Sequence, residues 1–417
     1  MKLFKEKTKQ VKFLADTLWS FAALSVMNVI TQFVLYPILR SVLGVEEYGN
    51  VLYLIGIVNI MATSVGSGVN LARLVASSKG KTYNTDSTVC LIAMQIIALP
   101  ICWIVLPKGD VPTAIDQFFW LWVLSGLTIW RYYADVEFRL KTNYKGYFVY
   151  YMAISAGYLL GVILFYLTQL WQMILVPGEL AGIIYVVWKG SIIRLDGGLD
   201  QKRFMPYVKS VLSLMTAQFM VNVVLNADRL ILKAFMGGEA VTLYYIASLV
   251  GKTIALISSP LNNVIIGYLV KSNQSLRAGD FLKISALGLA LTGIALLVCV
   301  GGSHVFAFLF YPVEYDVVKE LFWVADLAQI FYFISGVLTT ILLRYIAEKF
   351  QMIINGVFFL AFAVVTVSFT KLWGLNGFSI GLLLSNAFRY FFATVLGTVE
   401  LRRIVRIPSK SAIKRKE

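Results

Sequence analysis

The sequence has few charged residues and very little histidine or cysteine. Of its 417 residues, 14% are charged, one is histidine and three are cysteine. Soluble domains are about one quarter charged, so this composition excludes an ordinary water-soluble domain. Cys90, Cys102 and Cys299 lie inside apolar blocks without CxxC spacing, which indicates neither a disulfide framework nor a thiolate metal site. No P-loop, serine elbow, zinc motif or dinucleotide fingerprint occurs in an appropriate context, so we predict no enzyme activity, metal or organic cofactor.

Long apolar stretches dominate the chain instead. Hydrophobic residues make up 59% of the sequence, and the mean hydropathy is +0.77. A helix crosses a bilayer with about 20 apolar residues, so twelve crossings leave short loops and no room for a soluble catalytic domain. The blocks are continuous rather than alternating, which argues against an outer-membrane barrel. We predict an all-α integral membrane protein with twelve transmembrane helices, over Leu18–Leu39, Tyr48–Val69, Val89–Leu106, Phe118–Ala134, Phe148–Leu167, Met173–Ile193, Val208–Leu232, Val241–Val270, Ile284–Val300, Leu321–Leu343, Met352–Phe369 and Phe378–Val399.

The basic residues determine the predicted orientation. The net charge is +15, with 37 lysines and arginines. With the N-terminus inside, and with cations in the terminal turns of the seventh span (Lys209 and Arg229) counted with the adjoining segments, 27 of these lie in inward segments, 6 in outward segments and 4 within spans. The positive-inside rule therefore predicts that both termini are cytoplasmic, and the first helix is too long and lacks the cleavage site of a signal peptide. The basic excess reflects topology and attraction to anionic membrane lipids, not nucleic-acid binding.

An internal repeat divides the chain into two halves. The segment PILRSVLGVE from Pro37 aligns without gaps with LILKAFMGGE from Leu230, at an offset of 193 residues. Each copy ends the first helix of a six-span half, which indicates parallel repeats. We predict an N-terminal lobe over residues 1–200 and a C-terminal lobe with a basic cytoplasmic tail over residues 201–417. The stretch Arg194–Pro206 is the predicted linker.

The two repeat segments also carry a family resemblance. The stretch NADRLILKAFMGGEAVTLYYIA from Asn226 and its counterpart LRSVLGVEEYG from Leu39 resemble the polysaccharide transport family, the Wzx-type flippases. That family belongs to the superfamily of multidrug and toxic compound extruders, so the resemblance implies a MATE-like fold that works by alternating access. It also implies transfer of undecaprenyl pyrophosphate-linked oligosaccharides to the outer face of the bacterial cytoplasmic membrane, for O-antigen, capsule or exopolysaccharide synthesis. A polysaccharide polymerase and a chain-length regulator are the implied partners, and no motif specifies the glycan.

Four cations lie within the predicted spans, where a charge needs a route to the surface, a partner or a function. Arg131 and Lys189 are close to span ends, so snorkelling to the head groups is the expected explanation for both. Lys252 and Arg389 lie about 11 residues, or roughly 16 Å, from the start of their spans and cannot easily reach an interface. These two residues are therefore candidates for a function inside the membrane.

Polar residues follow the cations at helical spacing. Lys252 shares a helix face with Tyr245, Ser248, Ser259 and Asn263, and the seventh span carries Gln218, Asn222, Asn226, Arg229 and Lys233. The first span adds Asn28 and Gln32, and Ser385 and Asn386 lie near Arg389. Two interpretations stay open: the stripes hydrogen-bond neighbouring helices together, or they line a hydrated cavity. We favour the cavity.

Cations in such a cavity indicate an anionic cargo. We predict that Lys252, Arg389 and Arg229 hold the diphosphate of a lipid-linked oligosaccharide. Asn222, Asn226, Ser248, Asn28 and Gln32 complete the predicted substrate-binding set. The alternative function is an ion-coupled drug or cation extruder of the same superfamily, which would need acids near the cavity. Tyr150, Tyr151, Tyr158, Tyr244, Tyr245 and Tyr390 are either stacking surfaces for sugars or packing residues.

Two acids within the spans are candidates for ion coupling. Glu179 follows Pro177 and Gly178, a pair expected to interrupt the sixth helix, and Asp326 lies in the tenth span. A buried carboxylate can bind a proton or a sodium ion, and it can equally be the partner of a cation. Because no ATP-binding motif is present, a cation gradient acting through Glu179 or Asp326 is the predicted driving force.

Overall fold

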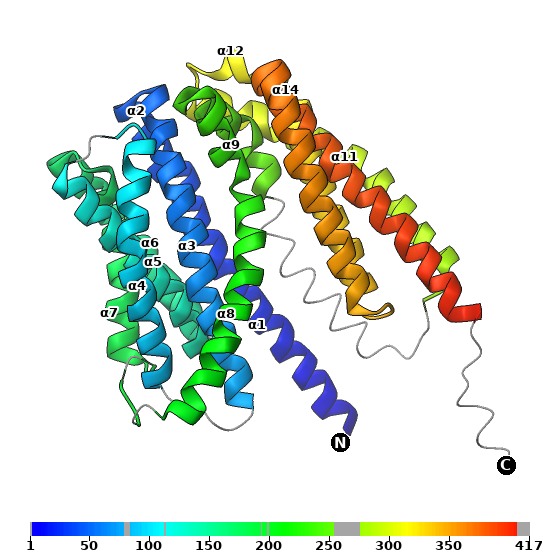
Figure 1. Ribbon diagram of the computed structural model, residues 1–417, viewed down its shortest axis with the longest axis horizontal. Helices are drawn as coiled ribbons and strands as arrows, with labels where there is room; N and C mark the ends of the chain where they lie inside the picture. Colours follow the sequence, from blue (N-terminus) through cyan, green and yellow to red (C-terminus); the bar gives the residue numbers. More distant parts are fainter. Residues whose placement is uncertain are drawn as a thin grey trace. The chain divides into compact units, whose positions relative to one another are not determined.

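The structure is a computed structural model that describes residues 2–78, 84–111, 114–192, 194–197, 200–253 and 276–406 (Figure 1). All regular elements within these ranges are helices. The chain forms two compact units, Met1–Thr242 and Leu243–Glu417. The first unit thus includes helices that follow the predicted lobe boundary at residue 200. The predicted basic tail after residue 406, and Ser259 and Asn263 of one polar stripe, lie outside the described residues.

The first unit is built from long, apolar helices joined by short irregular segments. Its elements are α1 (Lys2–Ile30), the π-helix η1 (Thr31–Leu35), α2 (Tyr36–Leu43), α3 (Val45–Ser78), α4 (Asn84–Lys108), α5 (Ile115–Lys141), α6 (Tyr144–Thr168), the 3-10 helix η2 (Trp171–Ile174), α7 (Val176–Lys189), α8 (Gln201–Leu225), α9 (Ala227–Met236) and the start of a helix over 238–253. Helix α3 packs against both α5 and α8, and α6 packs against α1 and α7. These contacts arrange α1, α3, α5, α7 and α8 around one interior space.

The second unit continues the helix over 238–253 and adds α11 (Ala278–Phe310), α12 (Tyr315–Val318), η3 (Lys319–Leu321), α13 (Phe322–Leu342) and α14 (Glu348–Arg406). Helix α14 is broken at Trp373 and Gly374, where Gly374 has a φ of 60°, so it comprises two helices as the predicted spans require. Phe281, Leu342 and Tyr390 form part of the core where α11, α13 and α14 meet.

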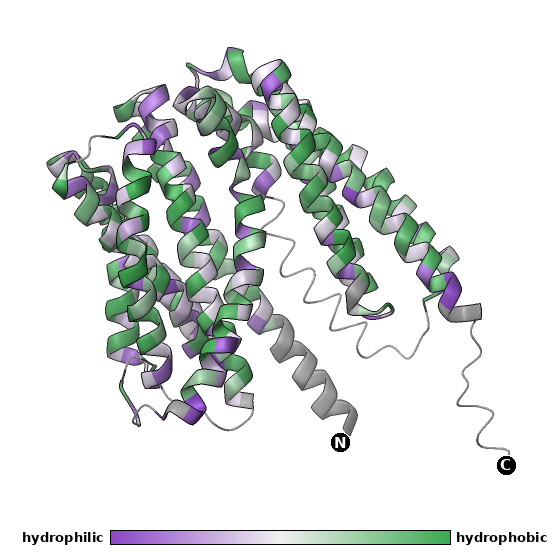
Figure 2. Ribbon diagram, in the orientation of Figure 1, coloured by the Kyte–Doolittle hydropathy of each residue, from purple (hydrophilic) through white to green (hydrophobic). Residues whose placement is uncertain are grey.

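The surface of the long helices is apolar. Eight helices among the described residues are long and apolar enough to cross a membrane, and the last of them includes both halves of α14. Figure 2 shows hydrophobic residues along the length of these helices. Large side chains such as Trp103, Ile294 and Leu360 are 59% to 65% exposed. Such exposure is costly in water and is the arrangement expected for a surface solvated by lipid.

Two predicted boundaries were wrong. Pro177 and Gly178 do not interrupt a helix, because α7 begins at Val176 and Pro177 occupies its first turn. Proline lacks an amide hydrogen that the first turn does not use, so it starts a helix well. The predicted linker over Arg194–Pro206 is also too long, because Asp200 caps α8 by accepting a hydrogen bond from the Lys202 backbone amide at 3.0 Å.

The repeat detected in the sequence has matching backbone geometry in its two copies. Gly44 ends α2 with a φ of 84°, and Gly237 ends α9 with a φ of 86°, at the same offset of 193 residues. Glycine adopts this region of φ without steric cost. The π-helix Thr31–Leu35 and the break between α8 and α9 at Asn226 also lie at equivalent positions. Each copy is therefore an irregular helix followed by a glycine turn into a new helix.

Candidate functional site

A polar cavity of about 260 Å³ lies inside the first unit. It is bounded by α1, η1, α2, α3, α5, α6, α7, α8 and α9. Its lining combines amide, hydroxyl and charged side chains with a smaller apolar part: Met27, Asn28, Thr31, Gln32, Tyr36, Ile55, Val58, Asn59, Thr63, Leu124, Thr128, Arg131, Tyr132, Tyr158, Leu175, Glu179, Asn222, Asn226 and Arg229. Two arginines and one glutamate give this lining a net positive charge.

Five of the eight predicted substrate-binding residues lie on this cavity: Asn28, Gln32, Asn222, Asn226 and Arg229. The amide nitrogens of Asn28, Asn222 and Asn226 donate to backbone oxygens one turn earlier on their own helices, at 2.8 to 3.0 Å. These three side chains therefore do not tie neighbouring helices together. For these three residues the cavity interpretation is therefore favoured over the interhelical one, whereas Asn386 donates to the Ala328 backbone oxygen of α13 at 2.9 Å and ties two helices together.

Arg131 and Glu179 form a buried ion pair on the cavity wall. The Arg131 Nε donates to both carboxylate oxygens of Glu179, at 2.7 and 3.0 Å, and the two side chains are 5% and 4% exposed. The Tyr158 hydroxyl donates to the same carboxylate at 2.7 Å. The expectation that Arg131 snorkels to the head groups was wrong, because its partner on α7 holds it inside. Lys189 is exposed, which agrees with the expectation that it snorkels to the head groups.

Arg229 enters the cavity through a gap left by a glycine. Its Nη1 donates to the Leu52 backbone oxygen at 3.4 Å. A Cβ atom on Gly56 would lie 2.9 Å from the Arg229 Cδ, so the absence of a side chain at Gly56 makes room for the arginine. One turn further along α9, the Lys233 ammonium donates to Asn50 at 2.6 Å and pairs with Asp110. The α9 end of the first unit is thus held to α3 by both cations.

The remaining predicted residues lie in the second unit. Arg389 packs between the rings of Tyr332 and Phe358, 5.1 and 4.9 Å from the two centroids, and donates to Asn355 at 3.2 Å. The Lys252 ammonium lies 5.9 Å from the Tyr244 ring. Ser248 is fully buried. These three residues do not line the cavity of the first unit.

Asp326 is the second predicted coupling acid, and it is fully buried in the second unit. One carboxylate oxygen accepts a hydrogen bond from the Gly251 backbone amide at 3.0 Å, and the other accepts from the Ser303 hydroxyl at 2.8 Å. Both donors are neutral. Asp326 therefore differs from Glu179, which is engaged by an arginine.

The candidate sugar-stacking tyrosines are packing residues, with one exception. Tyr150, Tyr151, Tyr244, Tyr245 and Tyr390 are at most 2% exposed and bury both faces of their rings. Tyr158 is the exception among the six, because it lines the cavity.

Sequence reasoning missed several lining residues on α3 and α5. Asn59 and Thr63 are four residues apart, and Thr128, Arg131 and Tyr132 are spaced by three and four residues, so each group occupies one helix face. These spacings were a detectable signal.

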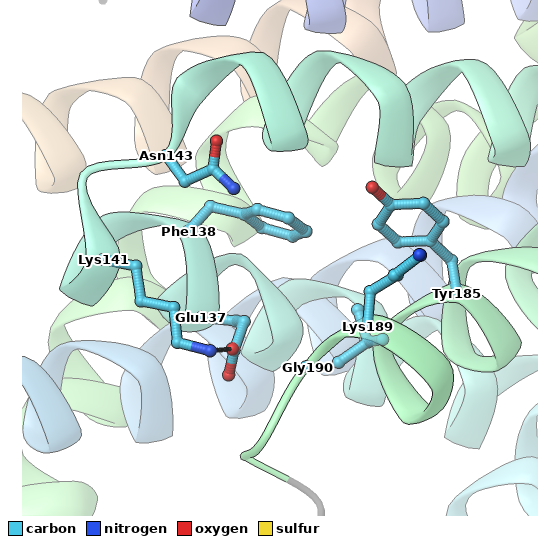
Figure 3. A pocket seen from close by; sticks show the side chains of 8 residues that line it. Glu137, Phe138, Lys141, Asn143, Tyr185, Lys189 and Gly190 are labelled. Carbon is cyan, nitrogen blue, oxygen red and sulfur yellow. Dashed lines mark hydrogen bonds and ion pairs between the residues drawn. The ribbon is translucent and has the colours of Figure 1, made fainter.

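A smaller cavity of about 110 Å³ lies where α5 and α7 end and α6 begins (Figure 3). Its lining includes Lys141, Tyr185 and Lys189, and Lys141 pairs with the buried Glu137. Glu137 also accepts a hydrogen bond from the Ile192 backbone amide at 3.2 Å. Glu137 thereby stabilises the position of the segment that follows α7, so its function is structural.

No protein-family model matches the sequence, and no curated protein matches it. Solved structures of MATE transporters do match. A multidrug resistance MATE family transporter of the MOP superfamily, in an inward-facing conformation, is 12% identical with a TM-score of 0.66, over 94% of this chain and 100% of that one. A MATE in the straight conformation has 13% identity and a TM-score of 0.64, over 95% and 97%. A mutant of the Vibrio cholerae MATE transporter VcmN has 13% identity and a TM-score of 0.61, over 94% and 97%. The predicted all-α, MATE-like membrane fold is confirmed, and the chain is a multi-pass membrane protein with the architecture of the MATE transporters.

Proposed function

We propose that this protein is a flippase for undecaprenyl pyrophosphate-linked oligosaccharides, which it moves from the cytoplasmic to the outer face of the bacterial cytoplasmic membrane. The observation that carries the proposal is the polar cavity of the first unit, with its two arginines and one already paired acid. A diphosphate and a glycan face a prohibitive cost in hydrocarbon, whereas the prenyl tail does not. A polar cavity in an apolar helical unit provides the environment that the head group needs.

The sign of the charge separates this function from its alternative. An ion-coupled drug or cation extruder of the same superfamily attracts its cargo with acids, and the neighbouring solved structures include multidrug transporters. Glu179, the one acid among the described residues that line this cavity, is neutralised by Arg131. A net positive cavity repels a cationic drug and attracts a diphosphate.

A cation gradient is the proposed driving force, with Asp326 as the better placed coupling residue. Its carboxylate is bound by two neutral donors, so a proton or a sodium ion would not have to displace an arginine. Glu179 would first have to leave Arg131. We further propose that both termini are cytoplasmic and that the flipped product passes to a polysaccharide polymerase with its chain-length regulator.

The proposal is tested by transport in liposomes. The purified full-length chain is reconstituted, and flipping of a fluorescent undecaprenyl pyrophosphate-linked oligosaccharide is measured by loss of its accessibility to an external quencher. Arg229→Ala should reduce the rate about tenfold or more, because a charge-assisted hydrogen bond is worth about 1.5–3 kcal/mol. Lys319→Ala is the matched control, because Lys319 is 42% exposed and pairs with the exposed Asp316. Transport of ethidium without transport of the lipid would establish the extruder instead.

A further inference from the structure

The contacts of Arg131 fix the orientation of its guanidinium plane, which a merely structural ion pair does not require. Glu179 contacts Arg131 through the Nε atom alone, and the Tyr132 ring lies 4.2 Å from the guanidinium carbon. Tyr158 in turn fixes the carboxylate. The guanidinium plane is therefore oriented by one acid and one aromatic ring.

The outer edge of the same guanidinium is left for another partner. A guanidinium has five N–H donors, of which Nε provides one and the two terminal nitrogens provide four. Within the described part of the chain, the terminal nitrogens contact only a weak acceptor, the Met27 sulfur, 4.0 Å from Nη1. Arg131 lines the cavity, and among the described residues no oxygen atom accepts a hydrogen bond from this edge.

On the basis of the function proposed above, we propose that Arg131 is a cargo-binding residue whose two terminal nitrogens bind one phosphate group of the head group bidentately. Paired N–H donors on a planar guanidinium match the spacing of two phosphate oxygens. Glu179 and Tyr158 are positioning residues, since they hold the guanidinium and do not touch the phosphate. Prior orientation reduces the conformational entropy lost on binding.

Arg229, the second arginine of the cavity, supplies the net positive charge that Arg131 lacks. Glu179 neutralises Arg131, so Arg131 contributes geometry more than net charge. Arg229 lines the same cavity and provides the positive charge. A diphosphate carries two phosphate groups and more than one negative charge, which suits one oriented fork and one further cation. A ligand with a single carboxylate would use either the oriented pair of N–H donors or the further cation, but not both.

Binding to the purified full-length chain in detergent micelles tests the proposal without relying on transport. The probes are undecaprenyl pyrophosphate, inorganic pyrophosphate and undecaprenol, which has no phosphate. The main variant combines Arg131→Gln with Glu179→Gln, because removing only one partner would leave a buried charge uncompensated. Lys145→Gln on α6 is the control, since Lys145 is exposed and outside the cavity lining.

The double variant should weaken undecaprenyl pyrophosphate binding about tenfold or more and leave undecaprenol binding unchanged. Arg131→Lys, which keeps the charge and loses the fork, should lose most of the same affinity, and Tyr158→Phe should lose less. Lys145→Gln should bind like the wild type. If inorganic pyrophosphate binds as tightly as the lipid, and with the same dependence on Arg131, the ligand of this site is a soluble phosphate-containing anion and not the lipid.

Two results would overturn the assignment of Arg131. One is a double variant that melts and binds both phosphate-containing probes like the wild type, which would make the ion pair structural. The other is a wild-type chain that binds neither of these probes. Failure of the proposed function is distinguishable, because a chain that binds pyrophosphate through Arg131 but does not move the lipid would retain the anion site without the flippase activity.

Discussion

Gly49 of α3 lies directly against the backbone of Gly238, with no space for a side chain between them. A Cβ atom on Gly49 would be 1.7 Å from the Gly238 oxygen, and one on Gly238 would be 2.2 Å from the Glu46 oxygen. Beside this contact, the Thr242 hydroxyl donates to the Val45 oxygen at 2.6 Å. Gly49 and Thr242 are equivalent in the repeat, and so are Val45 and Gly238. The two copies of the repeat therefore pack against each other through equivalent positions.

Gly49→Ala should destabilise this contact, because two backbones would have to separate. Overpacking costs about 1–3 kcal/mol, and here the neighbouring atom is a backbone oxygen that cannot rotate away. The measurement is the melting temperature of the purified chain in detergent. Gly301→Ala is the control, since nothing lies within 4 Å of the added Cβ on α11. An unchanged melting temperature for Gly49→Ala would show that the contact opens readily.

Lys233→Met should open the α9 end of the cavity. Lys233 is 5% exposed and holds Asn50 and Asp110, one turn beyond Arg229 on α9. In a chain without native cysteines, the cavity-lining Thr63→Cys should react several times faster with a membrane-impermeant maleimide when Lys233→Met is also present. Asp110→Asn should have a smaller effect, because Asp110 is 69% exposed and water replaces it. Equal labelling in all three backgrounds would contradict a closing function for Lys233.

Regularities along the helix were predictable from the sequence, and contacts between helices were not. The offset between Gly44 and Gly237 located the repeat, and the spacing of Asn222 and Asn226 located one wall of the cavity. Both signals depend on periodicity within a segment. The break at Asn226 had no such signal, because no proline or glycine marks it. The π-helix η1 did have one, because Pro37 follows it and cannot donate to the Phe33 carbonyl within it.

The position of Arg131 shows why one wall of the cavity was misjudged. Its distance from the end of its span favours snorkelling when the helix is considered alone. Its partner is 48 residues away on α7, and only the packing of α5 against α7 brings the two together. The tyrosines were ambiguous for the same reason, because burial by neighbouring helices decides whether a ring can stack on a sugar.

Lys252→Ala should abolish surface polysaccharide in the producing bacterium while the protein still inserts at normal abundance. The same result is expected for Arg389→Ala, with some loss of stability as well, because Arg389 packs against Tyr332 and Phe358. Loss of a cationic contact to cargo should lower transport about tenfold or more. Polymer on gels is compared with membrane abundance by immunoblot, and Lys252→Arg should retain more polymer than Lys252→Glu. Wild-type polymer at matched expression would exclude both residues from cargo handling.

Reporter fusions should show that both termini are inside. Fusions after Lys141, Arg203 and Arg277 should be cytoplasmic, and fusions after Lys108 and Glu314 should be external, as the basic residues require. Alkaline phosphatase and green fluorescent protein give opposite signals at each position, so each fusion is its own control. Cytoplasmic signals at both Lys108 and Glu314 would overturn the twelve-span topology.

Asp326→Asn should remove the dependence of flipping on a cation gradient while the fold is kept. Asparagine has nearly the same shape, so its amide oxygen can accept from the Gly251 amide, and its nitrogen can donate to the Ser303 hydroxyl. What it loses is the carboxylate that a proton or a sodium ion binds. In liposomes with imposed proton or sodium gradients, the wild-type rate should rise with one gradient and the variant rate should not. Asp116→Asn, on the exposed first turn of α5, should behave like the wild type. A variant that keeps the gradient response would exclude Asp326 as the coupling residue. If the wild-type rate is the same with and without either gradient, the protein is a facilitator, and consumption of the flipped product drives the net flux.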